Sequence, residues 1–133
     1  MSNNLWRILI AIVIAGHGVG HIFFLVPTLG LAEWGLAGRS WLLSGHVPDV
    51  AVKIVGGALW LLAIAGFVAA SIGILSQQEW WRGVAVASAA VSLLGLVLFA
   101  QPLQPIYSAG LMDLATLVAL LLIRWPTVEL VGS

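Results

Sequence analysis

The sequence predicts an all-α integral membrane protein built as a four-helix bundle, and three observations support this class. Of its 133 residues, 62% are hydrophobic and only 8% are charged, with a mean hydropathy of +1.13, whereas a soluble domain carries about 25% charged residues. Four apolar segments are each long enough to cross a bilayer, which takes about 20 residues. Prolines and short polar stretches separate these segments. Residues 1–133 are therefore expected to form a single transmembrane domain.

The predicted spans follow one another closely along the chain. The first covers about residues 5–26, the second about 50–75, the third about 80–100 and the fourth about 108–125. Pro27 follows the first span and Pro126 closes the fourth, because proline cannot continue a helix. Residues 76–79 leave so short a connection that the second and third helices must be antiparallel neighbours.

The segment between the first two spans is the only sizeable connection. Its stretch LAEWGLAGRSWLL is semi-apolar and contains Trp34 and Trp41. Such a segment is expected to lie along the membrane interface or to re-enter the bilayer.

Composition excludes several kinds of function. A formal net charge of 0 gives no reason to expect a nucleic-acid partner, and the lack of cysteine excludes disulfides and thiolate metal sites. The chain has no glycine-rich phosphate loop, nucleophile elbow, HExxH motif or paired-carboxylate motif. Any chemistry would have to depend on the few polar residues within the spans.

Small residues spaced four apart indicate where helices could pack closely in lipid. The pairs at this spacing are Gly16 with Gly20, Gly66 with Ala70, and Ser88 with Ser92. Gly16 and Gly20 are expected to form a groove for a neighbouring helix, while Gly18 faces elsewhere. The two serines are expected to hydrogen-bond back to their own helix.

The most unusual stretch is GHGVGH, residues 16–21, inside the first span. His17 and His21 lie four apart and so share one helix face. Asp113 in the fourth span and Lys53 in the second fall in the same leaflet. An unpaired charge is costly in hydrocarbon, so Asp113 is expected to face the bundle and find a partner. From depth, we expect His21 within direct or one-water reach of Asp113, with Lys53 competing and His17 one turn deeper.

Three interpretations of this cluster stay open. It is a structural clamp if one histidine bonds Asp113 and the other bonds a backbone carbonyl or a serine. It is a metal or porphyrin site if His17 and His21 bind a divalent ion, with the loop residue His46 as a third nitrogen. It is a proton-handling or lipophilic-ligand site if the polar groups serve a bound molecule.

Three stretches resemble a known family: LIAIVIAGHGVGHIFFLVP, ALWLLAIAGFVAASIGIL and QEWWRGVAVASAAVSLLGLVLF. They are similar to a widespread family of short bacterial membrane proteins, with HGxxH ending the first helix and Trp-Trp opening the third. The resemblance spans nearly the whole chain except the first loop. It implies a four-helix bundle in a bacterial inner membrane and no established activity. The family's fourth helix usually carries asparagine near its start, where this chain has Asp113. Helix layout is also loosely similar to DoxX-type proteins, which accompany redox systems.

The first span is expected to be retained, because its apolar region is too long for a signal peptide and histidines interrupt it. Arg7, Arg82 and Arg124 lie on the side of the termini, against Arg39 and Lys53 on the other side. This excess favours cytoplasmic termini.

Two classes of function remain. The first is a non-enzymatic accessory or scaffold subunit whose glycine faces meet a membrane-protein partner or a second copy of the chain; the thin inventory of charged residues favours it. The second is a binding protein or enzyme for a lipophilic molecule, such as a quinone or lipid, at His17, His21 and Asp113. No cofactor can be named from the sequence.

Overall fold

The computed structural model describes residues 3–34, 38–99 and 104–132, and over these residues it is helical without β-strands. Four helical stretches are long and apolar enough to cross a membrane: Asn3–Thr28, Asp49–Leu75, Trp81–Leu98 and Ile106–Ile123. The predicted four-helix class is therefore confirmed, with membrane insertion inferred from length and composition.

The first span consists of two helices, α1 (Asn3–Gly20) and α2 (Ile22–Thr28), which are separated at His21. The next two spans are single helices, α3 (Asp49–Leu75) and α4 (Trp81–Leu98). The fourth combines α5 (Gln104–Leu117) with the π-helix Val118–Ile123, and a short α6 (Val128–Val131) follows. The fourth helix thus begins at Gln104, before the predicted start at 108, and the predicted end of the third span at Ala100 falls outside the described residues.

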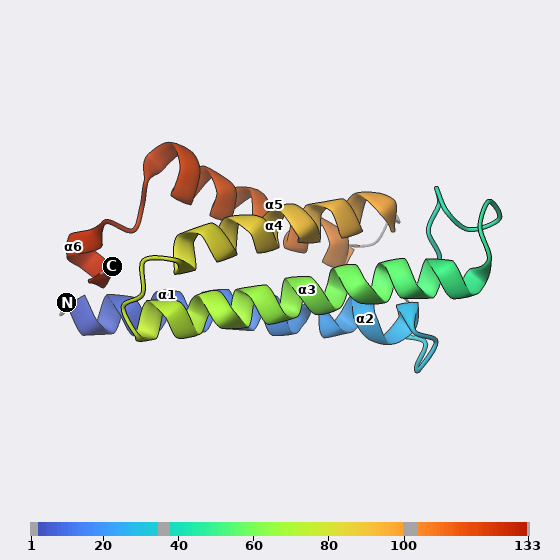
Figure 1. Ribbon diagram of the computed structural model, residues 1–133, viewed down its shortest axis with the longest axis horizontal. Helices are drawn as coiled ribbons and strands as arrows, with labels where there is room; N and C mark the ends of the chain where they lie inside the picture. Colours follow the sequence, from blue (N-terminus) through green and yellow to red (C-terminus); the bar gives the residue numbers. More distant parts are fainter. Residues whose placement is uncertain (1–2, 35–37, 100–103, 133) are drawn as a thin grey trace.

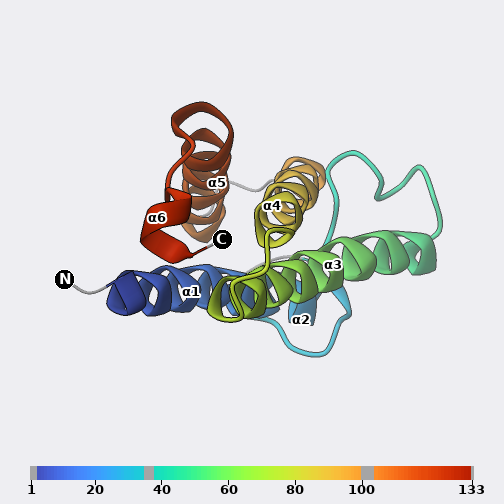
Figure 2. The same ribbon diagram turned by 60° about the vertical axis from the view of Figure 1, so that its left-hand side comes forward.

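The four spans form an arc rather than a closed square. Helix α3 packs against α1, α2 and α4, and α4 packs in turn against α5. Helices α1 and α5 are the two ends of this arc. Among the described residues, they do not pack extensively against each other. Figure 1 shows both termini at one end of the molecule, and Figure 2 shows α5 standing apart from α1 with α4 beside it. The bundle is consequently open between α1 and α5, except at the end where the termini lie, where the short α6 packs against α1.

Two apolar clusters form the core, one toward each end of the bundle. The cluster on the side of the termini contains Ile14, Phe67 and Ala89. The cluster on the loop side contains Phe24, Trp60 and Leu96. Along α1–α2 and along α4, the positions between these two clusters include the polar residues His17, His21 and Ser92.

The packing face of the first helix differs from the one expected. A Cβ atom at Gly18 would lie 2.6 Å from the Cβ atom of Phe67, so the backbones of α1 and α3 approach each other closely there. No described atom lies within 4 Å of a Cβ placed at Gly16 or Gly20. Within one chain, Gly16 and Gly20 therefore do not form the predicted groove for a neighbouring helix, and Gly18 is the packing glycine instead. In an arc, α1 has its neighbours on one side, and these two glycines lie away from α3.

The other small residues lie at the α3–α4 contact. Gly66 faces the side chain of Ser88 so closely that a Cβ at this glycine would overlap the serine hydroxyl. Ala70, Ser88 and Ser92 are buried. Small side chains therefore let α3 and α4 approach each other over this stretch, in keeping with packing in lipid.

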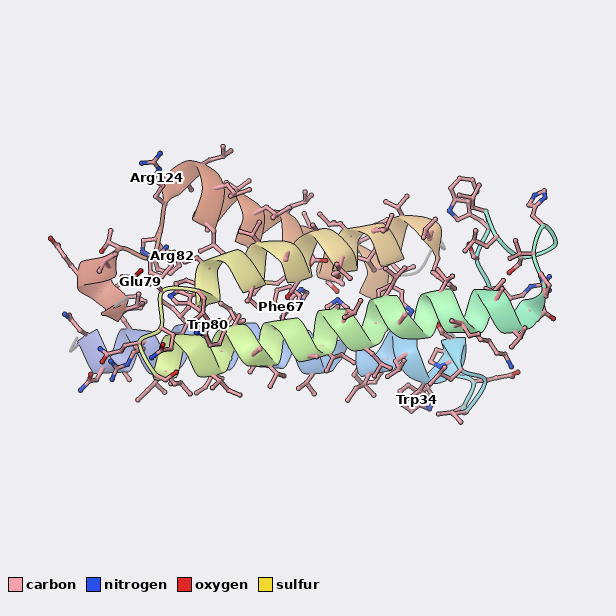
Figure 3. The ribbon with its side chains drawn as sticks, viewed as in Figure 1. Trp34, Phe67, Glu79, Trp80, Arg82 and Arg124 are labelled. Atoms are coloured by element: carbon pink, nitrogen blue, oxygen red, sulfur yellow. The ribbon has the colours of Figure 1, made fainter. Side chains whose placement is uncertain are left out.

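The connection between α2 and α3 caps the end of α4. Its described residues, 29–34 and 38–48, form turns and contain no helix. The hydroxyl of Ser40 donates to the carbonyl oxygen of Leu98 at 2.5 Å, and the indole N–H of Trp41 donates to that of Val97 at 2.6 Å. These bonds satisfy carbonyls that a helix end leaves without partners. Trp34, seen in Figure 3, and Trp41 remain exposed, as suits a segment at the interface.

Candidate functional site

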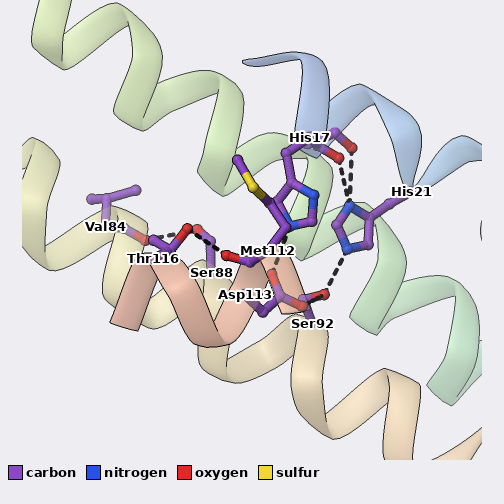
Figure 4. Close-up of polar contacts among 9 residues, drawn as sticks. His17, His21, Val84, Ser88, Ser92, Met112, Asp113 and Thr116 are labelled. Carbon is purple, nitrogen blue, oxygen red and sulfur yellow. Dashed lines mark hydrogen bonds and ion pairs between the residues drawn. The ribbon is translucent and has the colours of Figure 1, made fainter. Parts of the chain in front are cut away.

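Four side chains form a continuous hydrogen-bonded chain in the middle of the bundle (Figure 4). Nε2 of His17 lies 2.7 Å from Oδ1 of Asp113, and the hydroxyl of Ser92 donates to Oδ2 of the same carboxyl group at 2.5 Å. Nε2 of His21 lies 2.6 Å from the Ser92 oxygen. The chain therefore joins the first span to α4 and α5.

The chain is almost completely shielded. His21 is 1% exposed, and Ser92 and Asp113 are fully buried, while the side chain of His17 is 10% exposed. His17 lies about 21 Å along the helix from Asn3 and about 16 Å from Thr28, at 1.5 Å per residue. The polar chain is thus near the centre of the first span, where its hydrogen bonds have little competition from water.

The ring of His21 explains the break between α1 and α2. Its Nδ1 atom lies 3.0 Å from the carbonyl oxygen of His17 and 3.3 Å from that of Gly18. In a continuous helix, the backbone N–H of residue 21 would bond the His17 carbonyl. Here that N–H bonds Gly18 at 3.1 Å instead. The side chain has replaced a backbone donor, which is a known way to interrupt a helix.

The partner of Asp113 differs from the predicted one. We expected His21 to lie in direct or one-water reach, but His17 makes the direct contact and Ser92 connects His21 to the carboxyl group. Lys53 does not compete, because it is exposed and its ammonium group lies beside Gly30. Depth alone suggested His21, since the residue count gives position along a helix axis but not around it.

Ser92 is the site residue that the sequence interpretation missed. Both serines of α4 were expected to bond their own helix. Ser88 does so, donating to the carbonyl oxygen of Val84 at 2.7 Å, whereas Ser92 turns to Asp113. Its depth was a usable signal: Ser92 lies about 9 Å from the end of α4 and His21 about 10 Å from the end of the first span, on the same side of the membrane.

Aromatic rings enclose the two histidines. The ring centroid of Phe67 lies 4.8 Å from that of His17 and 5.9 Å from that of His21. Trp60 and Phe24 each lie 6.0 Å from His21. Trp60 is buried and donates its indole N–H to the hydroxyl of Thr28. These rings leave the polar chain in an apolar shell.

The hydrogen bonds determine how many protons the chain holds. Carbonyl oxygens only accept, so Nδ1 of His21 carries a hydrogen. The two bonds on either side of Ser92 need two hydrogens, and its hydroxyl supplies one. The other is either on Nε2 of His21, facing an ionised Asp113, or on the carboxyl group itself. With a neutral His17, both arrangements have no net charge, which is the state that hydrocarbon favours.

The same groups are close enough to share a metal ion. One ligand atom each from His17, His21 and Asp113 can be chosen so that all three lie within 4.8 Å of one another. His46 is an exposed residue of the loop and is not part of this group. Nε2 of His17, Nε2 of His21 and the carboxyl oxygens already make hydrogen bonds, so a metal ion would have to replace those bonds.

An apolar groove runs between α1 and the fourth span on the open side of the arc. Its volume is about 310 Å³, which is at the small end of the range for ligand pockets. Trp6, Trp81 and Trp125 line it toward the termini, and Ile14 and Met112 line it at the other end. Ile14 is three residues before His17 and Met112 directly precedes Asp113. His17 and Asp113 themselves are not among the residues that line the groove.

Replacing Ser92 with alanine should lower the free energy of unfolding in detergent by about 2 kcal/mol, because Nε2 of His21 and one carboxyl oxygen of Asp113 lose a buried partner. Ser88→Ala is the matched control, since the Ser88 hydroxyl bonds only a carbonyl of its own helix among the described residues. Denaturation followed by circular dichroism measures both changes. Equal losses for the two serines would contradict the bridging role of Ser92.

Comparison with known proteins adds no relative from which roles could be transferred. No family model, no curated protein and no solved structure matches the chain. What this site does must therefore be inferred from its own geometry and chemistry.

Proposed function

We propose that this protein binds a small membrane-soluble molecule in the groove between α1 and α5, with the polar end of that molecule at His17. The observation that carries the proposal is an apolar groove whose lining residues Ile14 and Met112 are close sequence neighbours of the hydrogen-bonded pair His17 and Asp113. An apolar cavity with a few convergent polar groups is the usual form of a small-molecule site.

The groove is suited to a ligand that differs from a plain acyl chain. Its walls are apolar almost throughout, with Thr116 among the few polar residues that line it. The hydroxyl of Thr116 donates to the carbonyl oxygen of Met112 at 2.9 Å and so has its hydrogen engaged. A hydrocarbon chain would fill such a groove but would gain nothing from the histidine beside its inner end. A molecule with one polar group and an apolar body gains from both.

Binding and a structural role for the cluster are compatible. Nε2 of His17 holds Asp113 and thereby ties α1 to α5. The side chain of His17 keeps 10% of its surface exposed. A clamp of this kind also orients the histidine, because a carboxyl group bonded to one ring nitrogen fixes which nitrogen carries the hydrogen.

Binding is tested with 4-bromoanisole and 4-bromophenol, small aromatic probes whose bromine quenches tryptophan fluorescence on contact. Three tryptophans line the groove, so we expect saturable quenching of the detergent-purified protein by at least one probe. Ala119→Phe fills the groove from the fourth span and should weaken saturable quenching about tenfold or more. Ala65→Phe is the matched control, because Ala65 is exposed on α3 and does not line the groove.

For both probes, quenching could instead rise linearly with probe concentration, without saturation and equally in the two variants. This would mean that the probes merely dissolve in the detergent. That result would remove the binding proposal. It would favour the alternative that the sequence suggested, an accessory or scaffold subunit whose polar chain is a structural clamp.

A second candidate function, contact with another membrane helix, is favoured by the open face of α1. Gly16 is exposed, and no described atom lies within 4 Å of a Cβ placed at Gly16 or Gly20. Glycines at this spacing allow close approach of two helices in a membrane, and the partner we propose is a second copy of the chain. The chain has no cysteine, so Gly16→Cys should give a disulfide-linked dimer in membranes, whereas Ala65→Cys on α3 should not.

We also propose that the protein lies in a bacterial inner membrane with both termini in the cytoplasm, as the family resemblance and the basic residues suggest. Figure 3 places Arg82 and Arg124 at the end of the molecule where both termini lie. Basic residues are enriched on the cytoplasmic side of membrane proteins. Cysteine labelling near either terminus with a membrane-impermeant reagent tests this orientation.

A further inference from the structure

We propose that His17, His21, Asp113 and Ser92 bind one zinc ion or a similar divalent transition-metal ion, and that their hydrogen-bonded chain is the metal-free form of this site. The metal site is independent of the groove and of any molecule bound there. It follows from three properties of the described residues: the donor atoms that converge, the way in which His21 is held, and the hydrogens that an ion would replace.

The donor set is one that transition metals prefer. His17, His21 and Asp113 offer two imidazole nitrogens and a carboxyl oxygen that lie within 4.8 Å of one another. In the described part of the chain, no other three histidine or acidic residues come together in this way. Two histidines and a carboxylate are a known ligand set for zinc, with an oxygen atom in the fourth position.

Ser92 is placed to supply the fourth oxygen. Its hydroxyl oxygen lies 2.6 Å from Nε2 of His21 and 2.5 Å from Oδ2 of Asp113. Nε2 of His17 lies 2.7 Å from Oδ1 of the same carboxyl group. Zinc bonds of about 2.0–2.1 Å would set neighbouring ligand atoms of a tetrahedral site about 3.3 Å apart. The hydrogen-bonded pairs therefore need to separate by less than about 1 Å to admit an ion, which small side-chain rotations provide.

The ring of His21 is held as metal-binding histidines usually are. Its Nδ1 atom carries a hydrogen and lies 3.0 Å and 3.3 Å from the carbonyl oxygens of His17 and Gly18. A histidine that binds a metal through one ring nitrogen commonly donates the other N–H to a carbonyl or carboxyl group, which fixes the ring and makes it a stronger ligand. The break between α1 and α2 thus leaves Nε2 of His21 directed toward Ser92.

Exchange of hydrogens for a divalent ion leaves the cluster without net charge. In the metal-free form, the two bonds on either side of Ser92 contain two hydrogens, and the cluster is neutral when His17 is neutral. An ion that replaces both hydrogens, with Ser92 bound as an alkoxide and the hydrogen of His17 moved to Nδ1, again gives a neutral cluster. A bound metal ion favours loss of the hydrogen from an oxygen that it coordinates, and hydrocarbon favours the neutral state.

Co²⁺ is the probe, because it occupies zinc sites and absorbs visible light strongly when its coordination is tetrahedral. We expect the protein, purified without a histidine tag and treated with EDTA, to bind one Co²⁺ per chain in detergent with a tetrahedral spectrum, and Zn²⁺ to displace it. Absence of this spectrum, or a spectrum of octahedral Co²⁺ alone, would overturn the metal site.

Asp113→Asn removes the charged ligand while keeping an oxygen for His17. It should weaken Co²⁺ binding by more than the roughly 10- to 100-fold that loss of an outer hydrogen-bond partner typically costs. His46→Ala is the matched control, because His46 is exposed and outside the cluster, and it should bind Co²⁺ as the wild type does. Undiminished binding in Asp113→Asn, or loss of binding in His46→Ala, would place the ion on the surface and overturn the assignment.

A measurement on the wild-type protein avoids variants that could fail to fold. The chain has three histidines, so selective ¹⁵N labelling gives a simple nitrogen spectrum. We expect Zn²⁺ to shift the ring nitrogens of two histidines and to leave those of the third, His46, unchanged. A shift confined to His46, or no shift, would contradict the metal site. Neither metal experiment involves the bromoaromatic probes, so failure of the metal site leaves the groove proposal standing, and the reverse also holds.

Discussion

Replacing Asp113 with alanine is expected to lower the free energy of unfolding in detergent by about 3–5 kcal/mol, which is typical for removal of one partner of a buried ionic pair. Asp113 is fully buried, and its carboxyl group is hydrogen-bonded to both His17 and Ser92. Its loss leaves these two side chains without that hydrogen-bond partner and removes the side-chain link between α1 and α5. Chemical denaturation followed by circular dichroism measures the loss.

Two further variants show whether the effect comes from the carboxyl group. Asp113→Asn keeps an acceptor oxygen for His17 but places an amide N–H₂ toward Ser92, so it should lose less stability than alanine. His46→Ala removes an exposed histidine outside the cluster and should leave the stability unchanged.

A double-mutant cycle tests which histidine is the direct partner. His17→Ala combined with Asp113→Ala should show a coupling of about 1.5–3 kcal/mol, the range for a hydrogen bond to a charged group. His21→Ala with Asp113→Ala should couple more weakly, because Ser92 lies between them. A stronger coupling of Asp113 with His21 than with His17 would instead support the direct pairing of His21 with Asp113 that depth suggested.

The number and limits of the spans could be predicted because membrane thickness imposes them. An apolar run of about 20 residues is a strong signal, and the second span was placed at 50–75 where α3 runs from Asp49 to Leu75. The least accurate limit was the start of the fourth helix, which begins at Gln104. QPLQP reads as a helix-breaking stretch, yet the helix starts within it, since proline is tolerated in a first turn.

The lateral arrangement could not be predicted in the same way. Residue count gives depth, and depth correctly grouped His17, His21 and Asp113 in one region of the membrane. The pairing within that group depends on which helices are neighbours, and an arc differs from a closed bundle in this respect. For the same reason, the sequence could not show that Gly18, rather than Gly16 or Gly20, faces α3. The stretch GHGVGH offers a small residue on several sides of the helix.

The small number of charged residues favoured a scaffold when only the sequence was considered. The structure shows where the charged residues within the spans lie. Asp113 is the only acidic residue within the four spans apart from Asp49 at the start of α3. Its single carboxyl group organises three other polar side chains, two from the first span and one from α4. Few charges are therefore enough to hold a polar cluster together in lipid, where one well-placed carboxyl group has little competition from water.

Replacing Gly18 with leucine is expected to be the most disruptive change among the three glycines of GHGVGH, with a loss of about 3 kcal/mol in the free energy of unfolding. A Cβ atom at this position would lie 2.6 Å from the Cβ of Phe67 and 3.4 Å from the carbonyl oxygen of Ile64. Neither neighbour can rotate away, because one is fixed to the backbone and the other is part of it. Helices α1 and α3 would have to separate.

The separation should also reach the polar chain, because Phe67 packs against the rings of both His17 and His21. Gly18→Leu should therefore weaken saturable binding of 4-bromophenol in whatever fraction still folds. Gly16→Leu is the matched control, because Gly16 directly precedes His17 as Gly18 directly follows it. No described atom lies within 4 Å of its Cβ position, and leucine favours a helix over glycine by up to about 1 kcal/mol. It should leave the monomer as stable as before or slightly more stable. Equal losses at the two positions would mean that α1 packs on both sides and that the arc is closed by a further helix, which a second copy of the chain could supply.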